Sequence, residues 1–278
     1  MNSTLPLVSV IVTTKNEEKN IERCLKSVKI QTYKNINLIV VDNNSKDRTT
    51  SLAAKYTSQV FIYGPERSAQ RNFGAKKAKG NYFLFIDADM ELSAKVVGEC
   101  VSKINVNSKI GGIIIPEVSI GTRFWEKTKA FERSFYNKSG DESTDAARFF
   151  PKEVYEAIGG YDENITGPED WDLPDMIKAK GYKIDRINEK IFHYENIPSL
   201  RSLLRKKYYY GIQSHRYLDK HQVSTISSKT LYFLRPVFYR EWKEFFKHPL
   251  LGLGLIAMLT GELFAGGTGY LIGKVNKS

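Results

Sequence analysis

The chain has 278 residues, of which 41% are hydrophobic and 26% charged, and this balance excludes an intrinsically disordered protein. Its length fits one large α/β domain with an appendage, or two small domains. The formal net charge is +11, and residues 201–247 hold eleven lysines and arginines against three acidic residues, so most of the positive excess precedes an apolar C-terminus.

A basic block in that position is compatible with nucleic acid, a phosphorylated substrate or anionic lipid, and its place beside an apolar segment favours lipid. The two cysteines, Cys24 and Cys100, are isolated and lack metal-ligand spacing, which predicts reduced thiols in a reducing compartment. The first residues lack a basic region followed by an apolar one, so we expect no secretory signal there.

The first third of the chain alternates short apolar runs with segments of helical periodicity. Asn16 is the expected N-cap of the first helix, because Glu17 and Glu18 then fall in its first turn. Such alternation predicts a parallel sheet with right-handed crossovers, which is half of a doubly wound α/β fold. We expect strands at 8–12, 37–41, 60–63 and 81–86, and helices at 16–30, 49–56 and 68–78.

The middle of the chain is less regular. A helix ends at Gly159 and Gly160, and another opens in the loop 167–173 and stops at Gly181. We expect strands at 111–116, 183–187 and 191–195, helices at 151–158 and from the loop 167–173 to about 180, and a helix or loop at 124–136.

The C-terminus reads as membrane-associated. Residues 249–273 contain one charge, Glu262, and are long enough to cross a bilayer. A small residue every fourth position, from Ala257 to Gly273, suits close helix packing in lipid. Seven glycines and the carboxylate oppose a span, and a soluble pair of core helices is the alternative. Residues 231–246 are expected to form an interfacial amphipathic helix.

The strand 81–86 ends in two carboxylates, Asp87 and Asp89. Ligands of open α/β sheets bind at the carboxyl ends of strands, where these side chains could hold a divalent cation and the phosphates it carries. A solvated turn is the alternative. Because no G-x-x-x-x-G-K-[ST] motif exists and the only glycine-rich run, 266–269, lies in the apolar tail, ATP-dependent phosphoryl transfer and nicotinamide binding are disfavoured. The remaining interpretation is a nucleotide that is held by polar loops and whose diphosphate is bridged by a metal ion.

These residues resemble the family 2 glycosyltransferases of the GT-A nucleotide-sugar fold, over roughly residues 6–195. VVDNNSKDRT at 40–49 is similar to the family's DDGSxDxT segment, and AQRNFG with AKG at 69–80 is similar to its ARNxGxxxAxG run. The other similar segments are the first strand and loop at 8–17, the Asp-Ala-Asp metal motif at 87–89, and the acceptor-side signature, GGYDE at 159–163 followed by EDWDL at 169–173.

The resemblance implies roles for the donor-side residues. Thr13, Glu17 and Asp42 would contact the nucleoside, Arg71 would face the base or the diphosphate, and Asp87 would lie near the ribose. Metal ligation, of Mn²⁺ or Mg²⁺, is implied for two further residues, Asp89 and His193. For His193 a packed or surface histidine is the alternative.

On the acceptor side, the resemblance places the general base of inverting members at Asp170. That chemistry needs a carboxylate within hydrogen-bond reach of the acceptor hydroxyl, opposite the leaving diphosphate. Glu169, taken as substrate-binding, and Asp172 are its rivals, and a helix-start cap explains one of the three. If the acceptor is an ionised lipid phosphate, Asp170 would orient it instead.

The chain departs from the family pattern at two places. Asn43 and Asn44 replace the second Asp and the Gly of the usual Asp-Asp-Gly-Ser, and no Q-x-x-R-W follows the acceptor signature, so a processive synthase is not expected. The basic run from Arg201 to Lys207, followed by three tyrosines, could close over the diphosphate, lie on lipid headgroups or form a solvated helix.

The resulting interpretation is an α/β GT-A, Rossmann-like mixed sheet with a helical membrane-associated tail: a catalytic domain at 1–200, a basic amphipathic segment at 201–247 and an apolar membrane segment at 248–278. We expect a metal-dependent inverting transferase that moves one sugar from a nucleotide donor to a lipid-linked or envelope glycan. Its catalytic domain is expected on the cytoplasmic side of a membrane. The sequence is compatible with a homo-oligomer. The alternatives are a membrane-tethered sugar-nucleotide-binding protein without turnover and a basic nucleic-acid-binding module.

Overall fold

The computed structural model describes residues 5–140 and 145–276, apart from the side chains of residues 137–139. The chain divides into two compact units. The first, here called the sheet unit, comprises 1–116, 146–163 and 172–193, and the second, the helical unit, comprises 117–145, 164–171 and 194–278. Each is described by itself.

A seven-stranded mixed sheet, in the order β3-β2-β1-β4-β8-β6-β9, forms the centre of the sheet unit. β1 pairs in parallel with β2 and β4, whereas β8 runs antiparallel to β4 and β6. The mixed sheet expected from the sequence is therefore present. Its strands are β1 (Val8–Thr14), β2 (Ile36–Asp42), β3 (Val60–Ile62), β4 (Tyr82–Asp87), β6 (Ile110–Ile114), β8 (Ala147–Pro151) and β9 (Lys183–Arg186).

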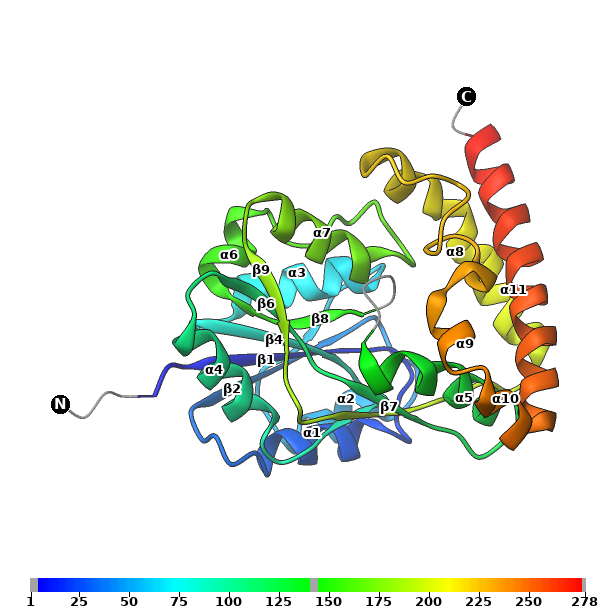
Figure 1. Cartoon of the computed structure of the whole chain (residues 1–278). Coiled ribbons are helices and arrows are strands. Elements are labelled where there is room, and N and C mark those ends of the chain that lie inside the picture. The colour runs from blue at the N-terminus through cyan, green and yellow to red at the C-terminus, as the bar shows by residue number, and fades with distance from the viewer. Residues whose placement is uncertain (1–4, 141–144, 277–278) are drawn as a thin grey trace. The chain divides into compact units, whose positions relative to one another are not determined.

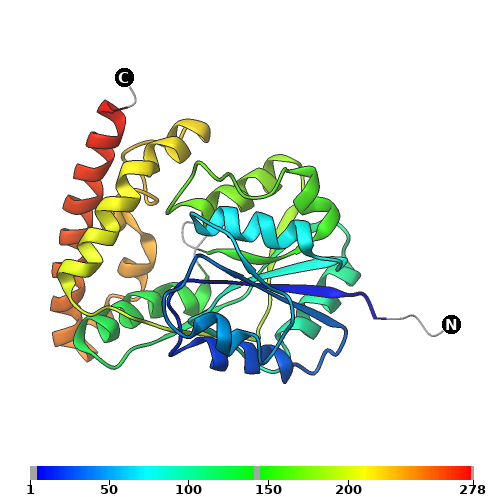
Figure 2. The ribbon, with the colours of Figure 1, turned by 180° about the vertical axis from the view of Figure 1, so that it is seen from behind.

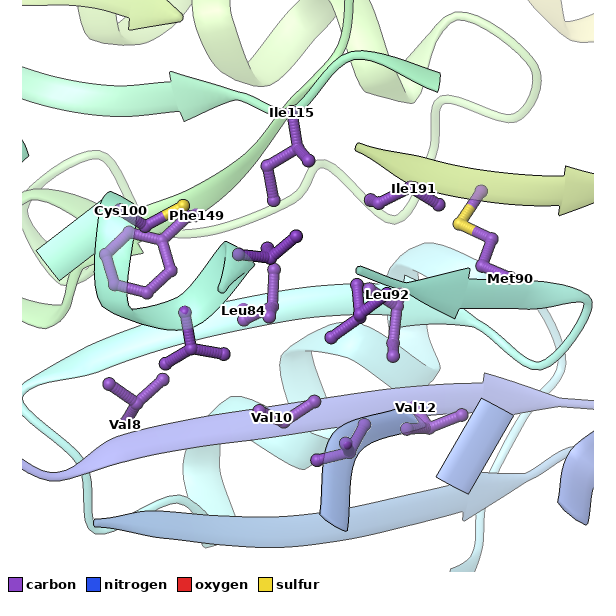
Figure 3. Packing of buried hydrophobic residues seen from close by; sticks show 14 of the residues in the cluster. Val8, Val10, Val12, Leu84, Met90, Leu92, Cys100, Ile115, Phe149 and Ile191 are labelled. Atoms are coloured by element: carbon purple, nitrogen blue, oxygen red, sulfur yellow. The ribbon is translucent and has the colours of Figure 1, made fainter. Parts of the chain in front are cut away.

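Helices cover both faces of this sheet (Figure 1), so its central strands are apolar on both sides. Alternate residues of β1 serve the two cores: Val8, Val10 and Val12 pack on one face, and Ile11 on the other. Figure 3 shows the first core, where Leu84, Phe149 and other buried side chains meet. The helices over this core are α1 (Ile21–Lys29), α2 (Thr49–Ala53) and α4 (Val96–Val106), and those over the other are α3 (Arg67–Lys77), α6 (Lys152–Ala157) and α7 (Glu169–Ala179).

A short antiparallel pair extends the sheet unit next to β4. β5 (Met90–Leu92) follows the Asp-Ala-Asp segment and pairs with β10 (Ile191–Tyr194). In this register His193 lies opposite Met90. The pairing thus brings a residue from late in the chain next to the end of β4.

The helical unit is built on two helices that lie side by side (Figures 1 and 2), α8 (Leu200–Lys220) and α11 (Pro249–Val275). Gly261 of α11 faces Leu204 and Gly273 faces Ile212, so the two helices run in the same direction. An aromatic and aliphatic core, including Phe135, Phe238 and Met258, joins them to the shorter elements. These are β7 (Glu117–Ile120), α5 (Phe124–Ser139), the 3-10 helix η1 (Tyr232–Leu234), α9 (Pro236–Arg240) and α10 (Lys243–Lys247).

Two expected helices differ from the structure. The first helix begins at Ile21 rather than Asn16, because Asn16 adopts a left-handed φ of 54° and bonds the 45–46 loop instead of capping a helix. Residues 231–246 form η1, α9 and α10 rather than one amphipathic helix, since Arg235 is extended before Pro236 and interrupts the helical backbone.

The apolar C-terminal segment is one continuous helix of 27 residues, α11, rather than a helix pair. Of the helices in the described part of the chain, it alone has the length and composition of a membrane span, with a mean hydropathy of 1.6. One third of that stretch is buried inside the protein. α11 therefore combines the length and hydropathy of a span with a partly buried surface.

Candidate active site at the carboxyl edge of the sheet

Three adjacent strands end together at one edge of the sheet. Thr13 of β1 lies opposite Asp87 of β4, and Thr14 lies opposite Asp42 of β2. The backbone joins the loops that follow, because Ala88 N donates to Thr13 O at 3.1 Å and Asn43 N to Thr14 O at 2.8 Å. Backbone hydrogen bonds therefore join the loops at the strand edge that the sequence predicts.

Asp87 is the most strongly held carboxylate of this edge. Its Oδ1 accepts a hydrogen bond from Thr13 Oγ1 at 2.7 Å and lies 3.3 Å from Arg71 Nη2, while Arg67 Nη1 lies 3.7 Å from Oδ2. Burial by itself raises the pKa of Asp87, but the guanidiniums of Arg71, Arg67 and Arg148 outweigh it and hold that pKa well below its usual range. Asp87 is thus fixed as an anion.

Asp89 has a different environment. Its Oδ2 lies 3.2 Å from His193 Nε2, across the β5–β10 pair. Its Oδ1 is buried and has no hydrogen-bond partner among the described residues. A buried oxygen without a partner is costly unless something binds it, and a carboxylate oxygen beside an imidazole nitrogen is a donor set that Mn²⁺ accepts. The two residues therefore fit a metal ion, although the described residues contain no group of three or more metal-ligating side chains.

Glu17 adds a further carboxylate near this pair. Burial raises the pKa of Glu17, a hydrogen bond from Asn20 Nδ2 at 2.7 Å opposes this, and the charges of Asp89, Asp87 and Asp47 raise it further. Mutual repulsion of this kind is relieved by a cation. Burial is the main cause of the raised pKa of Glu17, and the negative charges of Asp89, Asp87 and Asp47 add to it.

Asp42 and Arg71 are fully buried, which sequence reasoning did not anticipate. The Asp42 carboxylate accepts hydrogen bonds from the backbone and side chain of Ser45 and so shapes the 42–45 loop. Arg71 has its guanidinium carbon 4.9 Å from the ring centroid of Tyr161, in addition to its contact with Asp87. Arg71 therefore lies in the protein interior, in contact with Asp87.

Two positioning residues were missed in the sequence. Arg67 precedes Arg71 by one helical turn, and this i, i+4 spacing was an available signal. Asn72 Oδ1 accepts from Tyr155 OH at 2.7 Å and from Tyr161 N at 3.0 Å, tying α3 to the segment after α6. No local pattern in the sequence predicts that long-range pairing.

The acceptor-side carboxylates begin α7. Glu169 is 2% exposed and its Oε2 accepts a hydrogen bond from Gly167 N at 2.5 Å, which orders the loop before the helix. Asp170 is partly exposed in the first helical turn, and Asp172 is buried. Glu169 therefore orders the loop that leads into α7.

Comparison with known proteins agrees with this framework. The sequence model described as "Glycosyl transferase family 2" matches residues 9–159, more than half of the chain. The chain therefore belongs to glycosyl transferase family 2, and the resemblance inferred from the sequence is confirmed.

Individual relatives match over limited stretches. The glycosyltransferase AglE of Haloferax volcanii is 37% identical over 32% of this chain and 32% of its own length, and an uncharacterized glycosyltransferase of Rickettsia typhi is 25% identical over 70% and 63%. The GalNAc(5)-diNAcBac-PP-undecaprenol beta-1,3-glucosyltransferase of Campylobacter jejuni is 31% identical over 36% and 35%. The chain thus spans between about a third and just under two thirds of the length of these curated relatives.

Solved structures share the fold. The mannosyltransferase PcManGT from Pyrobaculum calidifontis, in complex with GDP-Man and Mn2+, aligns with a TM-score of 0.60 and 18% identity over 96% of this chain and 74% of that one. TarS residues 1–349 of S. aureus, in complex with UDP, aligns with a TM-score of 0.53 and 18% identity over 86% and 74%. The expected GT-A class of α/β fold is confirmed.

Proposed function

We propose that this protein is a metal-dependent inverting glycosyltransferase that moves one sugar from a nucleotide-diphosphate sugar to an acceptor. The observation that carries the proposal is the Oδ1 of Asp89, which is buried beside His193 and lacks a hydrogen-bond partner in the described part of the chain, at the strand edge where α/β folds bind nucleotides. Membership of glycosyl transferase family 2 supports it, as do structural neighbours that hold GDP-Man with Mn2+ or UDP.

Asp89 and His193 would hold Mn²⁺ or Mg²⁺. When bound, the ion supplies positive charge that offsets the charge growing on the departing diphosphate. Because Asp89 Oδ1 has no hydrogen-bond partner within residues 5–140 and 145–276, it could ligate the ion without breaking a hydrogen bond in that part of the chain. His193 keeps its ring next to the carboxylate through the β10–β5 pairing.

The donor-side residues bind and orient the nucleotide. Glu17, Thr13 and Asp42 contact the nucleoside or shape the loops that do, and Asp87 lies near the ribose. Arg71, being buried, is a positioning residue that keeps Asp87 ionised and fixed.

Asp170 is the proposed general base. Its carboxylate takes the proton of the acceptor hydroxyl as the hydroxyl oxygen forms a bond to the anomeric carbon and the bond from that carbon to the diphosphate breaks. Attack opposite the leaving group inverts the anomeric centre. Glu169 holds the 167–169 loop and so positions the acceptor side.

The acceptor is proposed to be a lipid-linked or envelope glycan, reached at the cytoplasmic face of a membrane through the C-terminal tail. The relative that acts on an undecaprenol-linked acceptor, by its name, supports this class of substrate. The basic 201–247 segment and the apolar α11 supply the corresponding surface.

The test is a screen of nucleotide sugars for metal-dependent release of nucleoside diphosphate by detergent-solubilised protein. We expect release with one donor class, its loss on chelation, and its loss in both Asp89→Ala and Asp170→Asn. Val106→Ala, an exposed apolar truncation on α4, is the control and should keep full release. Donor binding without release would instead identify a sugar-nucleotide-binding protein.

A further inference from the structure

The outer face of α11 carries large apolar side chains along most of its length, with Thr260 and Thr268 among them. Leu250, Leu253, Phe264 and Leu271 are between 63% and 74% exposed and recur at spacings that place them on one side of the helix. The one acidic residue of the helix, Glu262, is 1% exposed and lies on the opposite side. A predominantly apolar ridge of about 32 Å from Leu250 to Leu271, at about 1.5 Å per residue, is therefore left on a helix whose solvent face is normally polar.

The inner face of α11 is committed to protein contacts. A Cβ at Gly269 would lie 2.3 Å from Tyr208 O, and one at Gly273 2.0 Å from Ile212 O, so the helix lies almost directly on the α8 backbone. The small-residue stripe expected to serve helix packing in lipid is used here within the chain. The face of α11 that is turned away from α8 is therefore the one exposed outside the protein.

Charge pairing fixes the same orientation. Glu262 Oε1 lies 3.1 Å from Lys129 Nζ on α5, and Oε2 lies 3.5 Å from Lys207 Nζ on α8. Rotating or withdrawing α11 would leave these buried charges without partners, which is strongly unfavourable. The apolar ridge is thus held outward.

The neighbouring helix argues against a bilayer crossing. α8 runs beside α11 in the same direction, and its Arg205 and Lys206 are exposed. If α11 crossed the hydrocarbon core, these cations would enter it with α8, and charges at that depth are costly. A helix lying parallel to the surface avoids this cost.

The exposed charges around the ridge have one dominant sign. Between Leu200 and Asn276, nine exposed side chains are basic and one, Asp219, is acidic. Trp242 and Phe246, both exposed, stand just before α11 among these bases, an arrangement typical of an interfacial anchor. The exposed bases are Arg201, Arg205, Lys206, Arg216, Lys220, Arg240, Lys243, Lys247 and Lys274.

We propose that α11 lies in the plane of an anionic membrane surface, with its outer face buried at the boundary between headgroups and acyl chains, and does not cross the bilayer. This inference rests on the membrane association proposed above and specifies its geometry. The ridge supplies the apolar contact, and the basic side chains supply attraction to anionic headgroups.

Vesicle flotation tests the docking face. The purified protein should float with phosphatidylcholine vesicles containing 30% phosphatidylglycerol, and the double variant Leu253→Glu, Phe264→Glu should lose at least ten-fold in vesicle affinity. Val106→Glu is the matched control, since Val106 is 88% exposed on α4 and should leave binding unchanged. Equal flotation of wild type and double variant would overturn the proposal. So would a wild-type dimer in light scattering that the variant converts to monomer, because a second copy would then cover the ridge.

Cysteine labelling separates lying on the membrane from crossing it. Cys24 and Cys100 are buried, so Lys247→Cys and Lys274→Cys each add one reactive thiol, at the two ends of α11. In sealed inside-out vesicles from expressing cells, an impermeant maleimide should label both positions. Labelling of one position only would show a span and refute the in-plane geometry. Metal-dependent donor hydrolysis by the same variants, measured without membranes, reports on the proposed catalytic function independently.

Discussion

At the scale of single residues, the carboxyl edge of the sheet separates two aspartates that are two positions apart in sequence. The Asp87 carboxylate contacts Thr13 and Arg71, whereas Oδ1 of Asp89 accepts no hydrogen bond from the residues that the structure describes. One carboxylate is thus built into the framework and the other is available to a ligand. The same Asp-Ala-Asp segment supplies both because β4 ends at Asp87 and Asp89 lies in the turn before β5.

Arg71→Ala should destabilise the sheet unit by about 3–5 kcal/mol, because it leaves the Asp87 carboxylate buried without its main counter-ion. Asp87 has a depressed pKa in the folded protein, so its contribution to stability is present above the unfolded pKa of about 3.9 and is lost as pH falls. The deficit of Arg71→Ala should therefore be complete at pH 7 and shrink below about pH 4.

Urea unfolding of wild type and variant at several pH values measures this difference. Arg67→Ala is the control on the same helix, since Arg67 is one third exposed and lies 3.7 Å from Asp87, and a loss of at most about 1 kcal/mol is expected. A deficit for Arg71→Ala that did not vary with pH would show that lost packing, not lost charge pairing, is responsible.

At the scale of elements, the close approach of α8 and α11 depends on glycine. Gly269→Ala would place its Cβ 2.3 Å from the carbonyl oxygen of Tyr208, and backbone cannot move aside as a side chain can. We expect a loss of about 1–3 kcal/mol from the forced separation of the helices. Gly267→Ala, where nothing lies within 4 Å, should stabilise the helix slightly through better propensity.

Thermal unfolding followed by circular dichroism distinguishes the two alanine variants. A fall in Tm for Gly269→Ala together with an unchanged or raised Tm for Gly267→Ala is the expected pattern. Equal effects of both substitutions would mean that α8 and α11 do not approach as closely as the structure places them.

Elements defined by their own residues were predictable from the sequence, and elements defined by distant partners were not. β1, β2 and β4 are each dominated by short β-branched, aliphatic or aromatic runs, and their bounds were predicted to within two residues. Asn16 looked like a helix cap because its partners, Ser45 and Lys46, come from the next loop. β8 was not assigned, since ARFFP has no alternation to mark it and is defined by pairing with β4 and β6.

The candidate site likewise contains features that the sequence predicts and features that it does not. The positions of Asp87 at the end of β4, Asp89 in the following turn and His193 in β10 follow from local patterns and the family motif. The burial of Arg71 and the pairing of Glu262 with Lys129 do not, because each depends on side chains supplied from other elements. Glu262 was taken as evidence against a bilayer span for its charge alone, whereas its ion pairs show which face of α11 is turned inward.

At the scale of the whole molecule, the net charge of +11 has an uneven distribution with a consequence for where the protein acts. Exposed bases predominate from α8 to the C-terminus, and attraction to an anionic surface amounts to about 1 kcal/mol for each Lys or Arg close to it. Raising the salt concentration should weaken vesicle binding without abolishing it, because the apolar ridge is not screened.

Neutralising two of these bases tests how much electrostatic attraction contributes to vesicle binding beside the apolar ridge. Lys243→Gln with Lys247→Gln removes two exposed charges next to Trp242 and Phe246, which should cost about 2 kcal/mol, or roughly thirty-fold in affinity for vesicles containing phosphatidylglycerol. Lys95→Gln with Lys109→Gln makes the same change in net charge with exposed residues of the sheet unit, and should have little effect. If both double variants lost affinity equally, net charge alone would drive binding and the helical unit would not be the membrane face.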